Sequence, residues 1–119
     1  MIKNHALTEE DIQLLNYFFK HIRLEKELVL QQINSAKIIK NSTPYYIDYH
    51  LSKTQEDILP LKEYQVVSTI QIIHPDGAAP TLFNMMVKHG YIELFEICNA
   101  DCSELCFENL LKGEALVEF

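Results

Sequence analysis

The three cysteines of the chain lie in one short stretch, CNADCSELC, and their spacing is the feature that most directly suggests chemistry. Cys98, Cys102 and Cys106 follow a C-x-x-x-C-x-x-x-C pattern, and three such thiolates can hold an iron–sulfur cluster or, with His74 or His89, a zinc ion. Structural zinc sites more often use C-x-x-C pairs, however, and cysteine is frequently a buried apolar residue. We therefore interpret the cluster as structural, and predict neither a metal site nor a cofactor.

Nucleophilic catalysis by a cysteine would need a low-pKa thiolate beside an imidazole that a third group orients. His50, His74 and His89 are candidate bases, but no local motif indicates such an arrangement. A nuclease site is disfavoured because no Glu-x-Lys follows Pro75-Asp76, and three glycines are too few for a phosphate-binding loop. We predict a protein that is not an enzyme. The alternative is a small enzyme or ligand binder with a His/Cys pocket near the last predicted hairpin.

The charge of the chain is acidic and unevenly distributed. Ten basic and 17 acidic residues give a formal net charge of −7. Residues 1–60 carry 7 Lys or Arg against 8 Asp or Glu, a net −1, whereas residues 61–119 carry 3 against 9, a net −6. An acidic surface repels phosphate backbones and attracts basic proteins, and Arg23 is the only arginine available for bidentate phosphate contacts. We therefore predict a basic protein partner and no nucleic acid.

Length and composition indicate one globular domain, residues 1–119. Hydrophobic residues make up 48% and charged residues 23% of the 119-residue chain, close to the average for globular proteins. No apolar run is long enough to span a membrane, and the N-terminus becomes acidic before any apolar stretch develops. An odd number of cysteines fits a reducing compartment. We expect a cytoplasmic protein without membrane contacts.

Two helical segments are predicted within about residues 9–36. Thr8, which precedes three acidic residues, is a typical N-terminal cap because its hydroxyl accepts a backbone N–H and the carboxylates oppose the helix dipole. A second helical pattern follows a break near Arg23-Leu24, with Gln31, Gln32 and Lys37 on its outer side. We predict a helical hairpin, and one long helix through Ala36 stays an alternative. The predicted inner residues are Ile12, Leu14, Leu15, Phe18, Phe19 and Ile22 in the first helix and Leu28, Val29, Ile33 and Ala36 in the second.

Strand patterns follow over about residues 37–98. Lys37–Lys40 is predicted to be a short edge strand, and alternating apolar residues predict a second strand over Tyr45–Leu51. The turn sequence PDGAAP and the pair His89-Gly90 divide Val66–Asp101 into three segments, which predicts an antiparallel meander. The polar segment Ser52–Tyr64 is interpreted as a long connection. Finally, Ser103 is predicted to cap a short helix over about residues 104–112, ended by Gly113.

The predicted fold is therefore α+β, with an N-terminal helical hairpin on an antiparallel sheet of about four or five strands and a short C-terminal helix. Both faces of the middle strands carry large apolar side chains, so periodicity leaves open which set is core. This two-sided hydrophobicity predicts either helices on both faces or a partner, including a second copy of the chain. The candidate partner-contact surface comprises Phe83, Met85, Tyr91, Glu93 and Glu96.

The C-terminal third carries a resemblance to a family of small bacterial proteins of unassigned biochemical activity. The matching pattern is DG-x-x-P over residues 76–80 followed by GYI-x-x-x-EI-x-NAD over residues 90–101. Some similar proteins look like companions of secreted toxins, which implies an immunity role in which the chain binds and blocks a basic toxin. The chain has His89-Gly90 where such relatives have Asp-Gly, so the turn is kept but a carboxylate is lost.

A homodimeric structural protein without a separate ligand is a further alternative.

Overall fold

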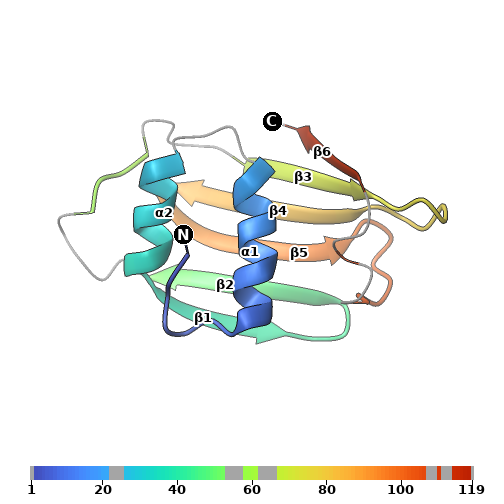
Figure 1. Cartoon of the computed structure of the whole chain (residues 1–119), viewed down its shortest axis with the longest axis horizontal. Helices are drawn as coiled ribbons and strands as arrows, with labels where there is room; N and C mark the ends of the chain where they lie inside the picture. Colours follow the sequence, from blue (N-terminus) through green and yellow to red (C-terminus); the bar gives the residue numbers. More distant parts are fainter. Residues whose placement is uncertain are drawn as a thin grey trace.

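The computed structural model describes residues 2–21, 26–52, 58–61, 67–106, 110 and 114–118. Two helices are followed by six strands (Figure 1). The elements are α1 (Glu9–His21), α2 (Lys26–Ser35), β1 (Lys37–Ser42), β2 (Tyr46–Ser52), β3 (Val67–Ile73), β4 (Thr81–Lys88), β5 (Tyr91–Asn99) and β6 (Glu114–Glu118). The α+β class with an antiparallel sheet is therefore confirmed. Among these described residues, no helix is both long and apolar enough to cross a membrane.

All strand pairs of the sheet are antiparallel, in the order β1-β2-β5-β4-β3-β6. Both helices lie across the same face of this sheet, so the single long helix is wrong (Figure 1). The predicted hairpin link, residues 22–25, lies outside the described residues. The sheet has one strand more than the four or five predicted, because β6 pairs with β3 at the edge.

The meander predicted for Val66–Asp101 is confirmed by β3, β4 and β5. His89 and Gly90 both have positive φ angles, 52° and 83°, as a tight two-residue hairpin requires. At the preceding turn Gly77 also has a positive φ, and its N–H donates to the His74 carbonyl. Asp101 closes the meander by accepting the Ser103 N–H at 3.0 Å. These turn residues are therefore explained by backbone geometry.

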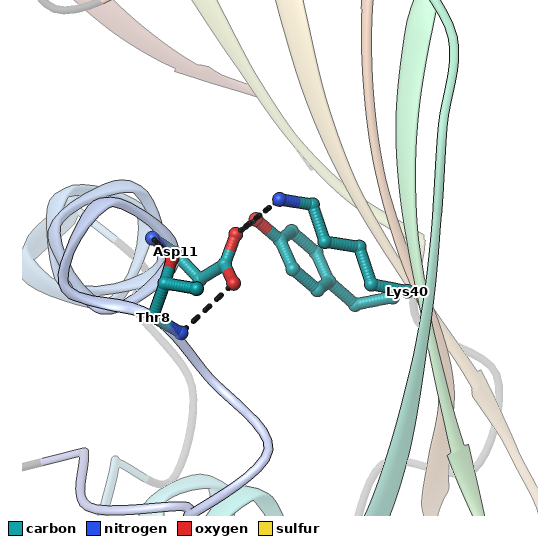
Figure 2. A network of polar contacts seen from close by, with 4 residues as sticks. Thr8, Asp11 and Lys40 are labelled. Atoms are coloured by element: carbon teal, nitrogen blue, oxygen red, sulfur yellow. Dashed lines mark hydrogen bonds and ion pairs between the residues drawn. The ribbon is translucent and has the colours of Figure 1, made fainter.

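The start of α1 forms a reciprocal cap that also fixes the helix to the sheet. The Asp11 N–H donates to Thr8 Oγ1 at 3.2 Å, and the Thr8 N–H donates to Asp11 Oδ2 at 3.0 Å. Asp11 Oδ1 accepts the Tyr49 hydroxyl of β2 at 2.7 Å and pairs with Lys40 Nζ of β1, also at 2.7 Å (Figure 2). Burial acts to raise the pKa of Asp11, but the bonds from Lys40, Tyr49 and Thr8 together hold it below its usual value.

Asp11 is therefore a buried charge on the inner side of α1, where the sequence pattern predicted only apolar residues. The buried positions of the helix are Asp11, Leu14, Leu15 and Phe18, so the inner stripe is centred one residue away from the predicted one. Ile12 and Phe19 are half-buried. The carboxylate is stable there because Thr8, Tyr49 and Lys40 all donate to it.

The core lies between the helices and the inner face of the sheet, which corrects part of the predicted contact surface. Phe18 of α1 stacks on Phe83 and contacts Phe95 edge to face, with ring centroids 6.4 and 5.4 Å apart. Phe83 and Met85 of β4 are buried, 1% and 0% exposed, because the helices cover the face on which they lie. They were predicted at the contact surface, and that prediction is wrong. The alternate residues of β4 face outward instead.

The chain end differs from the predicted short helix. Glu104–Cys106 are not helical, whereas Leu110, within the predicted helix, is helical and buried. Residues 107–109 and 111–113 lie outside the described residues. Glu114–Glu118 form β6, an element that the sequence reading did not predict. Of the predicted long connection Ser52–Tyr64, residues 53–57 and 62–64 likewise lie outside the described residues, and Ile58–Leu61 are considered below.

Candidate functional site

The face of the sheet opposite the helices is the first candidate site, and we call it the outer sheet face. Its side chains alternate with the buried ones along each strand, and no helix among the described residues covers it (Figure 1). Its described residues are Lys37, Ile39, Asn41, Tyr46, Asp48, His50, Ser52, Gln71, Ile73, Leu82, Asn84, Met86, Lys88, Leu94, Glu96 and Cys98.

The strand register arranges these residues in rows that cross the sheet. One row contains Ile39, His50, Leu94 and Met86 of β1, β2, β5 and β4. Ile39 is 51% exposed and Met86 is 37% exposed, whereas Leu94 between their strands is half-buried. The row is therefore an apolar band, interrupted by His50, on a face without a helix. A band of this kind is typical of a surface that contacts another protein.

The next row is acidic and polar. Asn41, Asp48, Glu96 and Asn84 follow one another across β1, β2, β5 and β4, so the two carboxylates lie directly opposite each other. Asp48 Oδ1 is buried and has no hydrogen-bond partner in the described part of the chain. The Cys98 thiol donates to Glu96 Oε1 at 4.0 Å, a long contact through sulfur. A buried carboxylate oxygen without a donor is unfavourable, and among the described residues Asp48 Oδ1 is the buried side-chain oxygen in this position.

The predicted contact residues divide between three places. Glu96 lies on the outer sheet face, whereas Phe83 and Met85 lie in the core. Tyr91 and Glu93 line a cavity at the last hairpin instead. Within β5, a β-bulge separates Tyr91 and Glu93 from Glu96: Met86 pairs with Leu94 and Val87 with Ile92, which leaves Glu93 as an extra residue. Strict alternation therefore fails between Ile92 and Leu94, and it could not be read from the sequence.

The cavity at the last hairpin has a volume of about 380 Å³. Its lining combines apolar and polar side chains: Gln32, Ser35, Ala36, Leu51, Ser52, Ile58, Lys88, His89, Tyr91, Ile92 and Glu93. Gln32 was predicted on the outer side of its helix but is buried. Its amide donates to the Leu59 and Gly90 carbonyls at 3.1 and 3.0 Å and accepts the Ile92 N–H at 2.8 Å. The periodicity of apolar residues does not identify a buried glutamine with this role.

The segment Ile58–Leu61 forms one wall of this region and is held against the hairpin. The Leu61 N–H donates to the Gly90 carbonyl at 2.7 Å, and the Tyr91 hydroxyl donates to the Ile58 carbonyl at 3.0 Å. A Cβ atom at Gly90 would lie 2.6 Å from Pro60 Cβ. Gly90 is thus required both for its positive φ and for the close approach of this segment.

A second cavity, of about 330 Å³, lies at the opposite end of the meander and contains His74, Thr81, Asn99 and Cys106 among its lining residues. Thr81 Oγ1 donates its single hydrogen to Asn99 Oδ1 at 2.7 Å, so the contact of 2.8 Å with His74 Nε2 requires that this nitrogen donates. His74 therefore carries a hydrogen on Nε2. Cys106 also lines the cavity, but within the described structure it forms no hydrogen bond with His74.

The cysteines are not combined with the hairpin histidine. Tyr91 and Cys98 are seven residues apart along β5, or roughly 23 Å at about 3.3 Å per residue. A pocket that combines a histidine and a cysteine near the last hairpin was the alternative prediction. The cavity there is lined by His89 but by no cysteine, so this combination is absent from it. Burial raises the pKa of the Cys98 thiol, with Glu96 and then Cys102 and Asp48 adding to the effect. A raised pKa makes Cys98 a poor nucleophile.

Metal ligation was the other chemistry considered for the three cysteines. Cys98 is half-buried, whereas Cys102 and Cys106 are exposed. In the parts of the chain that the structure describes, no three His, Cys, Asp or Glu side chains are grouped so as to hold a metal ion. The outer sheet face and the two cavities thus stay as the candidate sites. No protein-family model matches the sequence, and searches of curated proteins and of solved structures found no similar protein.

Proposed function

We propose that this chain is a protein-binding module without enzymatic activity, and that its outer sheet face binds a basic protein. The observation that carries this proposal is the apolar band of Ile39, Leu94 and Met86 beside the carboxylates of Asp48 and Glu96. An apolar band supplies the area that is removed from water on binding, and carboxylates beside it select a basic partner.

The charge of the face argues against self-association through it. Two copies that packed face to face would bring the Asp48 and Glu96 carboxylates of both copies into one interface, whereas Lys37 and Lys88 lie toward the His89-Gly90 end of the face. Carboxylates brought together in this way cost free energy unless cations intervene. The net charge of −7 adds a repulsive field to the encounter. A basic protein experiences the opposite field, so association is faster and depends on ionic strength.

An immunity-type role is the biological form of this proposal. A cytoplasmic acidic module that covers the basic active surface of a toxin would block it without chemistry, by occlusion and charge complementarity. The resemblance of residues 76–101 to companions of secreted toxins motivates this role, and the outer sheet face supplies a surface of the matching charge.

The test is an affinity capture from lysate of the cells that encode the chain, with wild type and two lysine variants. Met86→Lys places a cation on the outer sheet face, and Leu59→Lys is a matched control because Leu59 is also an exposed apolar residue, 61% exposed, away from that face. We expect wild type and Leu59→Lys to retain one basic protein at low salt, and Met86→Lys to lose it. Equal capture by all three variants, or capture that is indifferent to 0.5 M salt, would contradict the proposal.

A second candidate function is the binding of a small molecule in the cavity at the last hairpin. The specific observation is its volume of about 380 Å³, within the range of ligand sites, with Lys88 and His89 beside apolar residues. Ser52→Tyr would place a large side chain in the lining of this cavity, whereas the exposed Gln31 of α2 does not line it and Gln31→Tyr serves as the control. A fragment mixture observed by ligand-detected NMR should bind wild type and Gln31→Tyr but not Ser52→Tyr. Identical binding by all three proteins would exclude this cavity.

A further inference from the structure

The cavity at the last hairpin has a wall that the fold holds in place. The Gln32 amide and the Tyr91 hydroxyl donate to two carbonyls of residues 58–61 at 3.1 and 3.0 Å. The last N–H of this segment donates to the Gly90 carbonyl at 2.7 Å. Gln32 is itself buried, which shields its bonds from water. A wall that is already in place lowers the entropy cost of binding, because this segment does not have to become ordered around a ligand.

The interior of this cavity is apolar and small. Four apolar residues from different segments line it, Ala36, Leu51, Ile58 and Ile92. The volume of about 380 Å³ is near the lower end of the range of ligand sites. The cavity therefore suits one short apolar group and excludes a lipid chain or a large cofactor. Removal of such a group from water supplies free energy of binding.

Charged residues of both signs also line the cavity. Lys88 ends β4, and Glu93 is the extra residue of the bulge in β5; both are exposed. Neither forms an ion pair or a hydrogen bond with another residue that the structure describes, so the two charges do not neutralise each other. His89 lies beside Lys88 in the lining, and its imidazole carries at least one N–H. The apolar interior is thus bordered by an unpaired cation, an unpaired anion and a further donor.

We propose that this cavity binds a free α-amino acid with an apolar side chain, an inference that rests on the second candidate function. The ligand carboxylate pairs with Lys88 and accepts the His89 N–H, the ligand ammonium pairs with Glu93, and the apolar side chain lies in the interior. A simple carboxylic acid would leave Glu93 unpaired beside a like charge, and a simple amine would do the same at Lys88. A zwitterion satisfies both.

The direct test compares L-phenylalanine with two analogues that keep the same ring, because an aromatic ring also suits the Tyr91 ring in the lining. Hydrocinnamate lacks the ammonium group, and phenethylamine lacks the carboxylate. Amide signals of the full chain are followed by NMR at up to about 20 mM ligand, which detects millimolar affinity. We expect saturable shifts at the hairpin with L-phenylalanine and binding about fivefold weaker with either analogue, the effect of one partly exposed ion pair. Equal affinity for either analogue, or no binding of L-phenylalanine, would overturn the proposal.

Charge variants identify which group contacts which end of the ligand. Lys88→Gln should weaken L-phenylalanine about fivefold and leave phenethylamine unchanged, whereas Glu93→Gln should weaken L-phenylalanine equally and leave hydrocinnamate unchanged. Lys37→Gln is the matched control, since Lys37 is an exposed lysine that pairs with Ser52 at the same end of the sheet but does not line the cavity. If Lys88→Gln weakens all three ligands alike, Lys88 shapes the cavity instead of binding a carboxylate, and the proposal is wrong.

The fragment experiment with Ser52→Tyr distinguishes failure of this inference from failure of the candidate function. If fragments bind wild type and not Ser52→Tyr while L-phenylalanine does not bind, the cavity is a ligand site and the ligand class is wrong. If neither fragments nor L-phenylalanine bind, both are wrong. Capture of a basic protein by the outer sheet face is tested separately with Met86→Lys.

Discussion

Replacement of Asp11 by alanine tests whether the reciprocal cap and the sheet contact of α1 act as one network. The carboxylate accepts bonds from Tyr49, Lys40 and Thr8 at 2.7, 2.7 and 3.0 Å. Its loss leaves the Tyr49 hydroxyl, on a side chain that is 0% exposed, without a partner, which costs about 1–3 kcal/mol. The lost cap adds about 1 kcal/mol, whereas the half-exposed Lys40 returns to water at little cost. We expect Asp11→Ala to lower the free energy of unfolding by about 3 kcal/mol.

The coupling is measured with a double-mutant cycle of Asp11→Ala and Tyr49→Phe, by urea denaturation at pH 7 followed by circular dichroism. Tyr49→Phe alone removes one hydrogen bond and leaves Asp11 with two partners, so its cost is about 1 kcal/mol. In the Tyr49→Phe background no hydroxyl is left unpaired, and Asp11→Ala should cost about 1–2 kcal/mol less than in wild type. Additivity within about 0.5 kcal/mol would refute the reasoning, because independent residues show no larger deviation.

The same network predicts the acid limb of stability. The pKa of Asp11 is lower in the folded chain than its ordinary value. The contribution of the Asp11 carboxylate to the free energy of unfolding is therefore fully present above its pKa in the unfolded chain, about 3.9. This contribution is lost as the pH falls through the lower pKa that Asp11 has in the folded chain. Unfolding free energies measured between pH 6 and pH 2.5 should fall less steeply in Asp11→Asn than in wild type. Parallel acid limbs would show that Asp11 does not contribute to the pH dependence.

Three further predictions concern single residues. Gly90→Ala should displace the segment at Leu61, because the new methyl group meets that segment and the φ of +83° disfavours alanine. We expect the free energy of unfolding to fall by about 1–3 kcal/mol and the Leu61 amide to exchange hydrogen faster. Unchanged exchange at Leu61 would contradict this prediction. Burial and Asp11 raise the pKa of Tyr49, so the chain should lose stability above about pH 10, where an unfolded tyrosine ionises, and Tyr49→Phe should flatten this alkaline limb; identical slopes would count against it. Thiol labelling at pH 7.5, mapped by mass spectrometry, should modify Cys98 at least about tenfold more slowly than the exposed Cys102, and equal rates would show that burial does not control Cys98.

Local signals in the sequence predicted the elements whose causes are themselves local. The Thr8 cap, the His89-Gly90 hairpin and the Asp101 turn depend on the conformation of a few consecutive residues, and all three are present in the structure. The five strands from β1 to β5 also follow from alternation and turn chemistry. The C-terminal strand did not, because Glu114–Glu118 is a short segment without a turn signal that joins it to a neighbouring strand, and its pairing with the distant β3 makes it a strand.

Buried polar residues were missed for a different reason. Asp11 and Gln32 lie on the inner sides of their helices, 1% and 5% exposed, and each is stable there only because distant residues satisfy it. The partners of Gln32 include Gly90 and Ile92, about 60 positions further along the chain. No pattern within a helix encodes such a partner, so periodicity assigned Gln32 to the solvent side. Whether a buried polar side chain has a hydrogen-bond partner depends on the tertiary fold, so a local sequence pattern does not reveal it.

The candidate site depends on a similar tertiary choice. Phe83 and Met86 are both large and apolar, and nothing in β4 alone indicates which faces the helices. The core selects the set with Phe83, since Phe18 packs on it, and the bulge at Glu93 then lets β5 present Ile92 inward and Leu94 outward.

The helices α1 and α2 cover one face of the six-stranded sheet, and no helix among the described residues covers the other face, where the apolar band adjoins an opposed pair of carboxylates. Stability of the free chain would favour an uncharged residue at one of these two positions. The combination of apolar area with unsatisfied charge is what an interface for a cationic partner requires, and it is what a second copy of the same acidic face would disfavour. We therefore expect the outer sheet face to bind a cationic partner rather than a second copy of the chain.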